Sequence, residues 1–251
     1  VLAMAAQYRS AAGIDTFSLG FREPSYYESV FAQTMADFIG SRHHHEVLSL
    51  DTARDLIPAV LSRLDEPIAD PSILPTWLLS RLARRSVTVA LSGDGADELF
   101  AGYDPFSALG PASWYQRLVG GSLHRGLRRL VELLPHSRSN MSLDFKLRRA
   151  LRGLSYPQEY WNPLWLGPLE PGEIAELFQE QVSADELYAE AITAWREATS
   201  PDPVDRTLEF YTRFYLQDDI LTKVDRASMM HALEVRAPFL DNDLVEFTNC
   251  I

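Results

Sequence analysis

The chain has 251 residues, enough for one large domain or two modest ones, and its 46% hydrophobic and 23% charged residues are typical of a soluble globular protein without a membrane span. Its net charge of −12 argues against nucleic acid and anionic membranes as partners, because both are polyanions. With Cys250 as the only cysteine and no signal-peptide pattern, the sequence predicts a cytoplasmic protein without an intrachain disulfide.

Helix and strand patterns alternate along the first hundred residues. The opening segment 1–13 has helical periodicity but no capping residue before Val1, so we expect the sequence to continue upstream. The next elements in chain order are 15–21 (strand), 27–39 (helix), 45–50 (strand), 52–64 (helix), 76–84 (helix) and 86–91 (strand). The buried face expected for the first of these helices consists of Tyr27, Val30, Phe31, Met35, Phe38 and Ile39. Strands separated by helices predict an α/β fold, a parallel sheet with right-handed crossovers and flanking helices.

Strand patterns end near residue 104, and helical periodicity dominates the rest of the chain. We therefore expect an α/β part over residues 1–104 and a mainly helical part over residues 105–251. The clearest helix has apolar residues at Leu208, Tyr211, Phe214, Tyr215, Leu221, Val224 and Ala227. Trp161 and Trp165 are interpreted as core anchors. The arginine-rich stretches 125–129 and 146–152 are interpreted as solvated helix faces, with an anionic partner such as nucleic acid as the alternative.

The segment LSGDGADELFAGY, residues 91–103, follows the third strand pattern directly. Ligands of open parallel sheets bind at the carboxyl ends of strands, and this segment is expected at such an end. Gly93 and Gly95 would let the backbone approach a ligand closely and would permit positive φ.

Three carboxylates of this segment, Asp94, Asp97 and Glu98, would share one face if a helix begins here. A Mg²⁺ ion that bridges carboxylate and substrate phosphate would offset their repulsion. The alternative is helix capping, in which Ser92 or Asp94 accepts hydrogen bonds from first-turn amides. The segment alone leaves both interpretations open, and it lacks the lysine pattern of a P-loop.

A second segment, LTKVDRASMMHALEVRAPFLD (221–241), has the pattern of a helix followed by a fixed loop. Lys223 and Arg226 are candidates to face an anionic substrate or a phosphate. Internal ion pairs that dock the helical part onto the sheet are the interpretation of Glu234, Arg236 and Asp241.

Smaller features have simple structural interpretations. Three consecutive histidines, 43–45, predict a surface turn rather than a metal site, because they cannot all face one ion. Solvated loop acids are favoured for Asp65, Glu66 and Asp70, with a place in an acceptor site as the alternative. Tyr103 is expected to pack against other side chains rather than to close over a nucleotide.

The two long segments, in this order and at this distance, resemble the synthetase domain of glutamine-dependent asparagine synthetases, which belongs to the PP-loop ATP pyrophosphatase superfamily. The stretches DTFSLGF, SRHHHEVLSL and LDEPIADPS fit the same family, so the resemblance covers most of the chain. It implies a PP-loop type α/β fold, with residues 1–104 as the nucleotide-binding part, and it implies ATP and Mg²⁺ as cofactors.

The resemblance also implies a reaction. ATP adenylates the side-chain carboxylate of aspartate and pyrophosphate leaves; ammonia, produced from glutamine by an N-terminal glutaminase domain of the parent protein, then gives asparagine and AMP. By the same resemblance, Leu19, Ser92 and Gly93 contact ATP. Asp97 holds Mg²⁺ against pyrophosphate, and Asp94 lies near ammonia and the acyl-adenylate. Gly95 completes the expected nucleotide-binding residues, and Glu98 and Lys223 are the further catalytic candidates.

This sequence departs from the family pattern in ways that affect activity. A pyrophosphate-binding loop expected just before Val1, a lysine expected beyond APFLD and the glutaminase domain all lie outside these 251 residues, so we expect the chain alone to be nearly inactive. The stretch IADPSILP lacks the arginine that many asparagine synthetases have near the aspartate. Two alternatives therefore stay open, namely a related amidotransferase or cyclase (β-lactam synthetase or lasso-peptide cyclase type) for another carboxylate, and a non-catalytic module. Homodimer formation also stays open.

Overall fold

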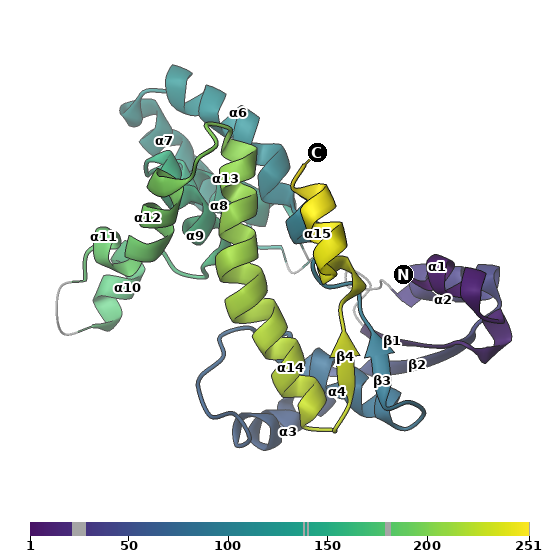
Figure 1. Ribbon diagram of the computed structural model, residues 1–251. Helices are drawn as coiled ribbons and strands as arrows, with labels where there is room; N and C mark the ends of the chain where they lie inside the picture. The colour runs from purple at the N-terminus through teal and green to yellow at the C-terminus, as the bar shows by residue number, and fades with distance from the viewer. Residues whose placement is uncertain (22–28, 138, 140, 179–181, 251) are drawn as a thin grey trace. The chain divides into compact units, whose positions relative to one another are not determined.

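The computed structural model describes residues 1–21, 29–137, 139, 141–178 and 182–250 (Figure 1). The chain forms two compact units. The first, here called the α/β unit, consists of residues 1–96 and 216–251, and the second, the helical unit, consists of residues 97–215. This division differs from the one expected at residue 104, because the C-terminal stretch returns to the α/β unit and contributes a strand and a helix to it.

The α/β unit contains most of the strands and helices expected from the sequence. Its elements are α1 (Leu2–Tyr8), a 3₁₀ turn (Ala11–Gly13), β1 (Asp15–Phe21), α2 (Ser29–Ile39), β2 (Arg42–Leu48), α3 (Leu50–Leu61), α4 (Ile73–Arg84), β3 (Val89–Leu91), α14 (Thr222–Met229), β4 (Glu234–Arg236), a 3₁₀ turn (Pro238–Leu240) and α15 (Asn242–Thr248). Tyr27, the first residue of the helix expected over 27–39, lies outside the described residues, and the rest of that helix is α2.

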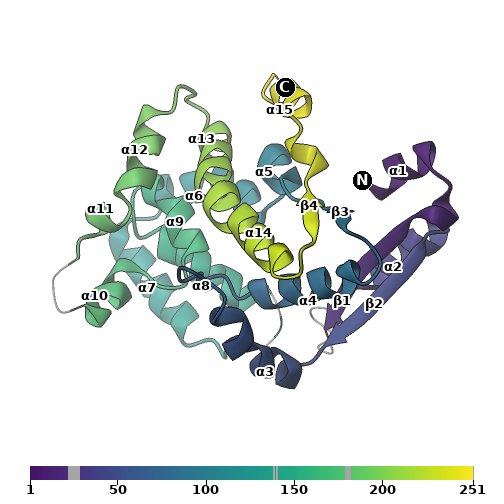
Figure 2. The same ribbon diagram turned by 60° about the horizontal axis from the view of Figure 1, so that its bottom comes forward.

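The strands pair in parallel, as expected, but they form two sheets of two strands within the described residues. In one sheet β1 pairs with β2, from Asp15 opposite Arg42 to Phe21 opposite Leu48. In the other, β3 pairs with β4, so the expectation of one sheet from three consecutive strands was wrong (Figure 2). The sequence did not reveal β4 because a strand of three residues is too short for a periodic pattern.

The histidines at 43–45 lie inside β2, so the expectation of a surface turn was wrong. Hydroxyl groups of β1 stabilise this placement, because Thr16 Oγ1 lies 2.9 Å from His43 Nδ1 and Ser18 Oγ lies 2.9 Å from His43 Nε2. Ser18 Oγ also lies 2.9 Å from His45 Nδ1. His43 and His45 therefore share the hydroxyl-bearing face of the strand pair, as the period of two in a strand requires, while His44 Nε2 lies 2.8 Å from Asp15 Oδ1 of β1.

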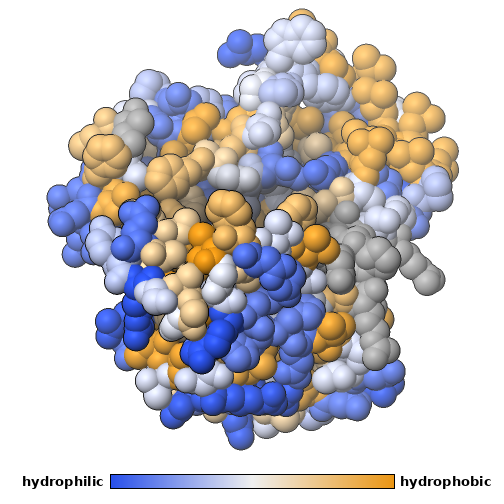
Figure 3. Space-filling view, turned by 90° about the vertical axis from the view of Figure 1, so that its right-hand side faces the viewer, coloured by the Kyte–Doolittle hydropathy of each residue, from blue (hydrophilic) through white to orange (hydrophobic). Residues whose placement is uncertain are grey.

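The core of the α/β unit lies between α3, α4 and the strand β2. Its buried residues are Leu48, Val60, Ile73, Trp77, Leu78 and Ala227. In contrast, the apolar face expected to be buried on α2 is exposed, with Phe31 77% and Phe38 84% accessible. The buried residues of this helix are the small Ser29 and Ala36. Apolar side chains are visible among hydrophilic ones on this side of the molecule in Figure 3.

The helical unit contains only helices and turns within the described residues. These are α5 (Ala96–Phe100), whose first residue belongs to the α/β unit, α6 (Asp104–Leu118), α7 (Gly121–Glu132), α8 (Leu143–Gly153), a 3₁₀ turn (Gln158–Tyr160), α9 (Trp161–Leu166), α10 (Pro171–Leu177), α11 (Ala184–Leu187), α12 (Ala189–Glu197) and α13 (Pro203–Phe210). Its core includes Trp161 and Trp165, so the prediction that these residues are core anchors is confirmed.

One continuous helical stretch joins α13 to α14, and its middle part, Tyr211–Leu221, is wound as a π-helix (Figure 1). The helix predicted from Leu208 to Ala227 is present, but its winding was not predicted. The apolar pattern breaks between Tyr215 and Leu221, which lies inside the π-helical part. Long π-helical segments are rare, and the apolar spacing used to recognise helices in a sequence is that of the α-helix, so it does not detect π-helical winding.

Most basic side chains of the arginine-rich stretches already have partners in the helical unit. Arg128 pairs with Glu132 and Glu170, and Arg152 lies 3.5 Å from Glu173. The guanidinium of Arg149 donates to the carbonyl oxygens of Trp165 and Leu166. These contacts leave few free charges for a polyanion, which favours the structural interpretation of the two stretches. Among the described residues, no helix has both the length and the apolar character needed to cross a bilayer.

Candidate active site

The turn between β3 and the helix α5 (Ala96–Phe100) contains the glycines and the first carboxylate of the segment 91–103. Ser92 continues the pairing of the sheet, because its backbone N–H donates to the Arg236 carbonyl at 2.8 Å. The turn therefore leaves the carboxyl ends of the parallel strands β3 and β4, where α/β folds place their ligands.

The two glycines of this turn have different roles. Gly95 has φ +91°, and a Cβ on it would lie 2.3 Å from Leu240 Cδ2, so both the backbone and the packing require glycine. Gly93 is exposed, and a Cβ on it would meet nothing within 4 Å. The fold therefore does not require glycine at position 93, and open space lies above its backbone.

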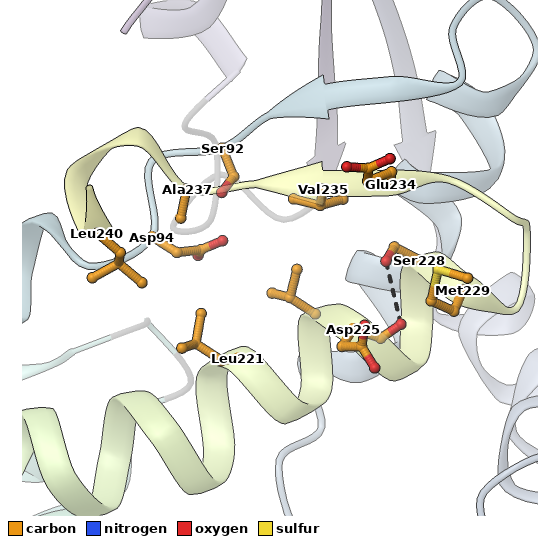
Figure 4. A pocket seen from close by; sticks show the side chains of 11 residues that line it. Ser92, Asp94, Leu221, Asp225, Ser228, Met229, Glu234, Val235, Ala237 and Leu240 are labelled. Atoms are coloured by element: carbon orange, nitrogen blue, oxygen red, sulfur yellow. Dashed lines mark hydrogen bonds between the residues drawn. The ribbon is translucent and has the colours of Figure 1, made fainter. Parts of the chain in front are cut away.

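A cavity of about 340 Å³ lies in the α/β unit between β4 and α14 (Figure 4). Its walls are formed by Ser92, Asp94, Leu221, Val224, Asp225, Ser228, Met229, Glu234, Val235, Ala237 and Leu240. Figure 4 shows the Asp94 carboxylate directed into the cavity, at the end where the strands finish. The walls carry three carboxylates and no lysine or arginine, so they would repel an anion that carries no cation with it.

Capping does not account for Asp94. The helix α5 begins at Ala96, and the Asp94 carboxylate makes no hydrogen bond or ion pair with any part of the chain that the structure describes. The Ser92 hydroxyl is directed to the Arg236 carbonyl at 3.5 Å rather than to a helix amide. Neither Ser92 nor Asp94 therefore caps α5, so the capping interpretation that the sequence left open is wrong for both residues.

The carboxylates of α5 have different environments. Asp97 is exposed, and its side chain has no hydrogen-bond or ion-pair partner among the described residues. Glu98 is only 2% exposed, and its Oε1 accepts a hydrogen bond from the Tyr103 hydroxyl. Within the helical unit, Glu98 therefore anchors Tyr103, and its expected catalytic role stays a prediction. The expected common face of Asp94, Asp97 and Glu98 is not formed, because α5 begins at Ala96, after Asp94, and because Asp97 is exposed whereas Glu98 is buried.

Tyr103 packs in the helical core, as expected. Its ring stacks on that of Tyr211, with the centroids 5.1 Å apart, and lies edge-on to Tyr215. Burial and the hydrogen bond to Glu98 raise the pKa of the Tyr103 hydroxyl above its usual range. The phenol therefore stays protonated and continues to donate to Glu98.

Lys223 is buried in a polar cluster of the α/β unit. Its Nζ donates to Asp70 Oδ2 and to Ser72 Oγ, both at 2.7 Å. Burial opposes ionisation of Asp70, but hydrogen bonds from Lys223 and Ser72 outweigh it and lower the pKa of this carboxyl. The expected role of Lys223 toward an anionic substrate stays a prediction, and the structure gives its ammonium group a protein partner.

Arg226, one turn further along α14, binds the same loop. Its guanidinium lies 2.5 Å from Asp65 and 3.6 Å from Glu66. Asp70 is therefore held by the helix rather than solvated, which corrects the expectation for this residue, whereas Asp65 and Glu66 are largely exposed, as expected. Two basic residues at i and i+3 of α14 thus fix the loop that precedes α4.

The remaining candidates have local contacts. Glu234 and Arg236 pair with each other at 2.7 Å, whereas Asp241 accepts from the Asp243 amide and caps α15. These three residues therefore do not form the expected network that docks the helical part onto the sheet. They form one local ion pair and one helix cap. Leu19 lies on β1 opposite Glu46 and packs against the core of the α/β unit, so its contact with ATP stays a prediction.

Sequence reasoning missed the contribution of α14 to the cavity. Leu221, Asp225 and Ser228 follow each other at intervals of four and three residues, which places them on one helical face. This spacing was visible in the sequence, but a polar residue on an amphipathic helix is more often solvated than directed into a cavity.

Comparison with known proteins gives a consistent result. A family model described as asparagine synthase matches residues 1–251. A relative from Mycobacterium tuberculosis, whose name assigns it provisionally as a glutamine-hydrolyzing asparagine synthetase, is 33% identical over 91% of this chain and 34% of its own length. Asparagine synthetase 1 of Bacillus subtilis, also named glutamine-hydrolyzing, is 28% identical over 91% of this chain and 35% of its own length. The chain thus spans about a third of the length of these curated relatives. With its whole length matched by the family model, the chain belongs to the asparagine synthase family.

Proposed function

We propose that this chain is the synthetase part of an ATP-dependent, amide-forming ligase that converts aspartate to asparagine. ATP first transfers its adenylyl group to the side-chain carboxylate of aspartate, and pyrophosphate leaves. Ammonia from glutamine then attacks the acyl-adenylate, so that a C–N bond forms and AMP leaves. The names of the relatives support the overall reaction, and a glutaminase domain of the parent protein would supply ammonia in the cytoplasm.

The observation that carries this proposal is the environment of the Ser92–Gly95 turn. It follows the carboxyl end of β3, leaves the Gly93 backbone open to a ligand, and directs the Asp94 carboxylate into a cavity. Nucleotide phosphates approach exposed backbone closely in this type of turn. Ser92 and Gly93 would contact the phosphates, while Gly95 sets the turn through its positive φ and its contact with Leu240.

The Asp97 carboxylate suits a magnesium ion that is bound together with nucleotide. Asp97 has no hydrogen-bond or ion-pair partner among the described residues, so its oxygen atoms are free to act as ligands. No group of three or more acidic, histidine or cysteine side chains in the described residues could hold a metal by itself. Mg²⁺ commonly takes one or two carboxylates and completes its shell with water and substrate phosphate. When bound, the ion would neutralise charge that develops on the leaving pyrophosphate.

The other residues of the proposal act through position and charge. Asp94 would face the acyl-adenylate and orient the attacking ammonia by accepting a hydrogen bond from it. Lys223 and Arg226 hold the loop 65–72, which is the expected acceptor region, through Asp70 and Asp65. Glu98 would act indirectly, because its hydrogen bond from Tyr103 ties the end of α5 to the helical core.

The products of the reaction test this proposal. The full-length protein that contains this chain, supplied with ATP, Mg²⁺, aspartate and ammonium, should form AMP and pyrophosphate in a one-to-one ratio with asparagine. Formation of ADP and inorganic phosphate would exclude adenylation. An Asp94→Asn variant should reduce the rate of asparagine formation more than it reduces ATP binding.

A second acceptor is favoured by one observation. The walls of the cavity contain no lysine or arginine, and Lys223, which contacts the loop 68–75, is already bound to Asp70. The two carboxylates of an aspartate bound in this cavity would therefore have no cationic side chain in its walls. A carboxylate with fewer negative charges, as in a related amidotransferase or cyclase, suits this lining better. AMP formation measured with a panel of carboxylic acids would decide between aspartate and such an acceptor.

A further inference from the structure

Gly102, just after the C-terminal end of α5, lies against the carboxylate of Asp97. Gly102 N donates to the Asp97 carbonyl at 3.0 Å, which closes the helix with a 6→1 hydrogen bond. A Cβ on Gly102 would lie 2.0 Å from Asp97 Oδ1 and 2.9 Å from Asp97 Cγ. The carboxylate therefore occupies the space that any other residue at position 102 would fill with its side chain.

The backbone does not explain why residue 102 is glycine. The left-handed conformation of this helix end belongs to Ala101, with φ +56°, while the φ of Gly102 lies outside the left-handed region. An alanine at position 102 would thus have an allowed backbone. The three atoms nearest to its Cβ would all belong to Asp97, namely the two carboxyl atoms and, at 3.2 Å, Cα.

We propose that Gly102 is a positioning residue that sets the orientation of the Asp97 carboxylate for a divalent cation. The inference rests on the proposed function, in which Asp97 is a metal ligand. Because no described side chain binds this carboxylate, its orientation depends on its own rotamer and on the surface beneath it. The hydrogen bond from Gly102 to the Asp97 carbonyl fixes that surface relative to the side chain.

An alanine at position 102 would displace the Asp97 carboxylate far enough to change metal binding measurably. Carbon and oxygen atoms that are not bonded rarely approach within about 3 Å, so an alanine methyl would push Oδ1 away by about 1 Å or more. A metal or catalytic group must be held within about 0.5 Å of its productive position. The carboxylate is the free end of a side chain, so it would move without disrupting the fold.

Binding of Mn²⁺ as a spectroscopic probe tests the inference in the full-length protein. Mn²⁺ bound to the protein is measured by electron paramagnetic resonance in the presence of ATP, after subtraction of the Mn²⁺ that ATP alone binds, for the wild type, for Gly102→Ala and for Gly110→Ala. Gly110 is the matched control, because it lies in α6 and a Cβ on it would meet nothing within 4 Å. Gly102→Ala should weaken Mn²⁺ binding about 10- to 100-fold, as loss of ligand orientation does, and Gly110→Ala should bind like the wild type.

The outcomes separate this inference from the proposed function. Unchanged Mn²⁺ affinity in Gly102→Ala would overturn the role of Gly102, whereas a wild type without ATP-dependent Mn²⁺ binding would overturn the proposed function. If Gly102→Ala lowers the melting temperature, the loss should disappear when Asp97→Ala removes the carboxylate. A loss of stability that persists in the Asp97→Ala background would show that the backbone, rather than the carboxylate, requires glycine, and would also overturn the inference.

Discussion

Replacing Lys223 by methionine should destabilise the α/β unit by about 3 kcal/mol, because it leaves a buried carboxylate without its cation. Lys223 is 9% exposed, and its Nζ lies 2.7 Å from both Asp70 Oδ2 and Ser72 Oγ. Methionine matches the four-atom stem of lysine and removes the ammonium group, with its charge and its hydrogen bonds to Asp70 and Ser72. Breaking a buried pair in this way costs about 3–5 kcal/mol. We expect the lower end, since Asp70 keeps hydrogen bonds of 2.8 and 2.7 Å from the Ser72 amide and hydroxyl.

Urea unfolding followed by circular dichroism measures this loss as a change in the free energy of unfolding. The double variant Asp70→Asn/Lys223→Met should recover most of it, because the carboxylate that Lys223 binds is then neutral. Arg54→Met is a matched control in the same unit, since Arg54 makes only exposed pairs with Asp51 and Asp55 and should change stability by less than about 0.5 kcal/mol. A Lys223→Met variant as stable as the control, or a double variant less stable than the single one, would refute the reasoning.

Three further predictions concern the α/β unit. Gly95→Ala should destabilise it by about 2–4 kcal/mol, since alanine would be strained at φ +91° and would overlap Leu240; a urea midpoint equal to the wild type would contradict this. Gly93→Ala should leave the melting temperature unchanged but weaken ATP binding in calorimetry, and equal affinity would remove the glycine from the nucleotide site. Burial and the neighbouring His45 lower the pKa of His43 below 6.5, so the unfolded chain takes up its proton first and stability should fall as pH decreases below about 6.5. His43→Gln should reduce this slope in melting curves between pH 7.5 and 5, and an unchanged slope would exclude His43 as a cause.

The sequence predicted those elements of the fold whose patterns are local. The strand β1 and the helices α3 and α4 follow from apolar periodicity over seven or more residues, and they appear within a few residues of the expected bounds. The strand β4 has only three residues, and its partner β3 lies more than 140 residues earlier in the chain, so no local pattern could reveal the pair. The exposed face of α2 shows a second limit of sequence patterns. Periodicity predicts that a helix has an apolar face, but it does not predict whether another part of the protein covers that face.

In the candidate site, too, the sequence predicted some features and not others. Glycines and acids of the segment 91–103 identified the turn, but only the structure separates Gly95, which the fold requires, from Gly93, which it does not. Likewise, three acids in five positions appear equivalent in the sequence, whereas Glu98 is buried against Tyr103 and Asp97 is exposed. Such differences depend on residues distant in the sequence or on the exact helix start, and neither follows from spacing.

The most direct measurement of the central claim is the affinity of the full-length protein for ATP with and without Mg²⁺. Isothermal titration calorimetry should show ATP binding that requires Mg²⁺ and that weakens about tenfold or more in Asp97→Asn, because an amide is a poorer ligand for a hard cation. Equal affinity in the presence and absence of Mg²⁺, or an Asp97→Asn variant that binds like the wild type, would contradict the claim that these acids hold a divalent cation together with nucleotide.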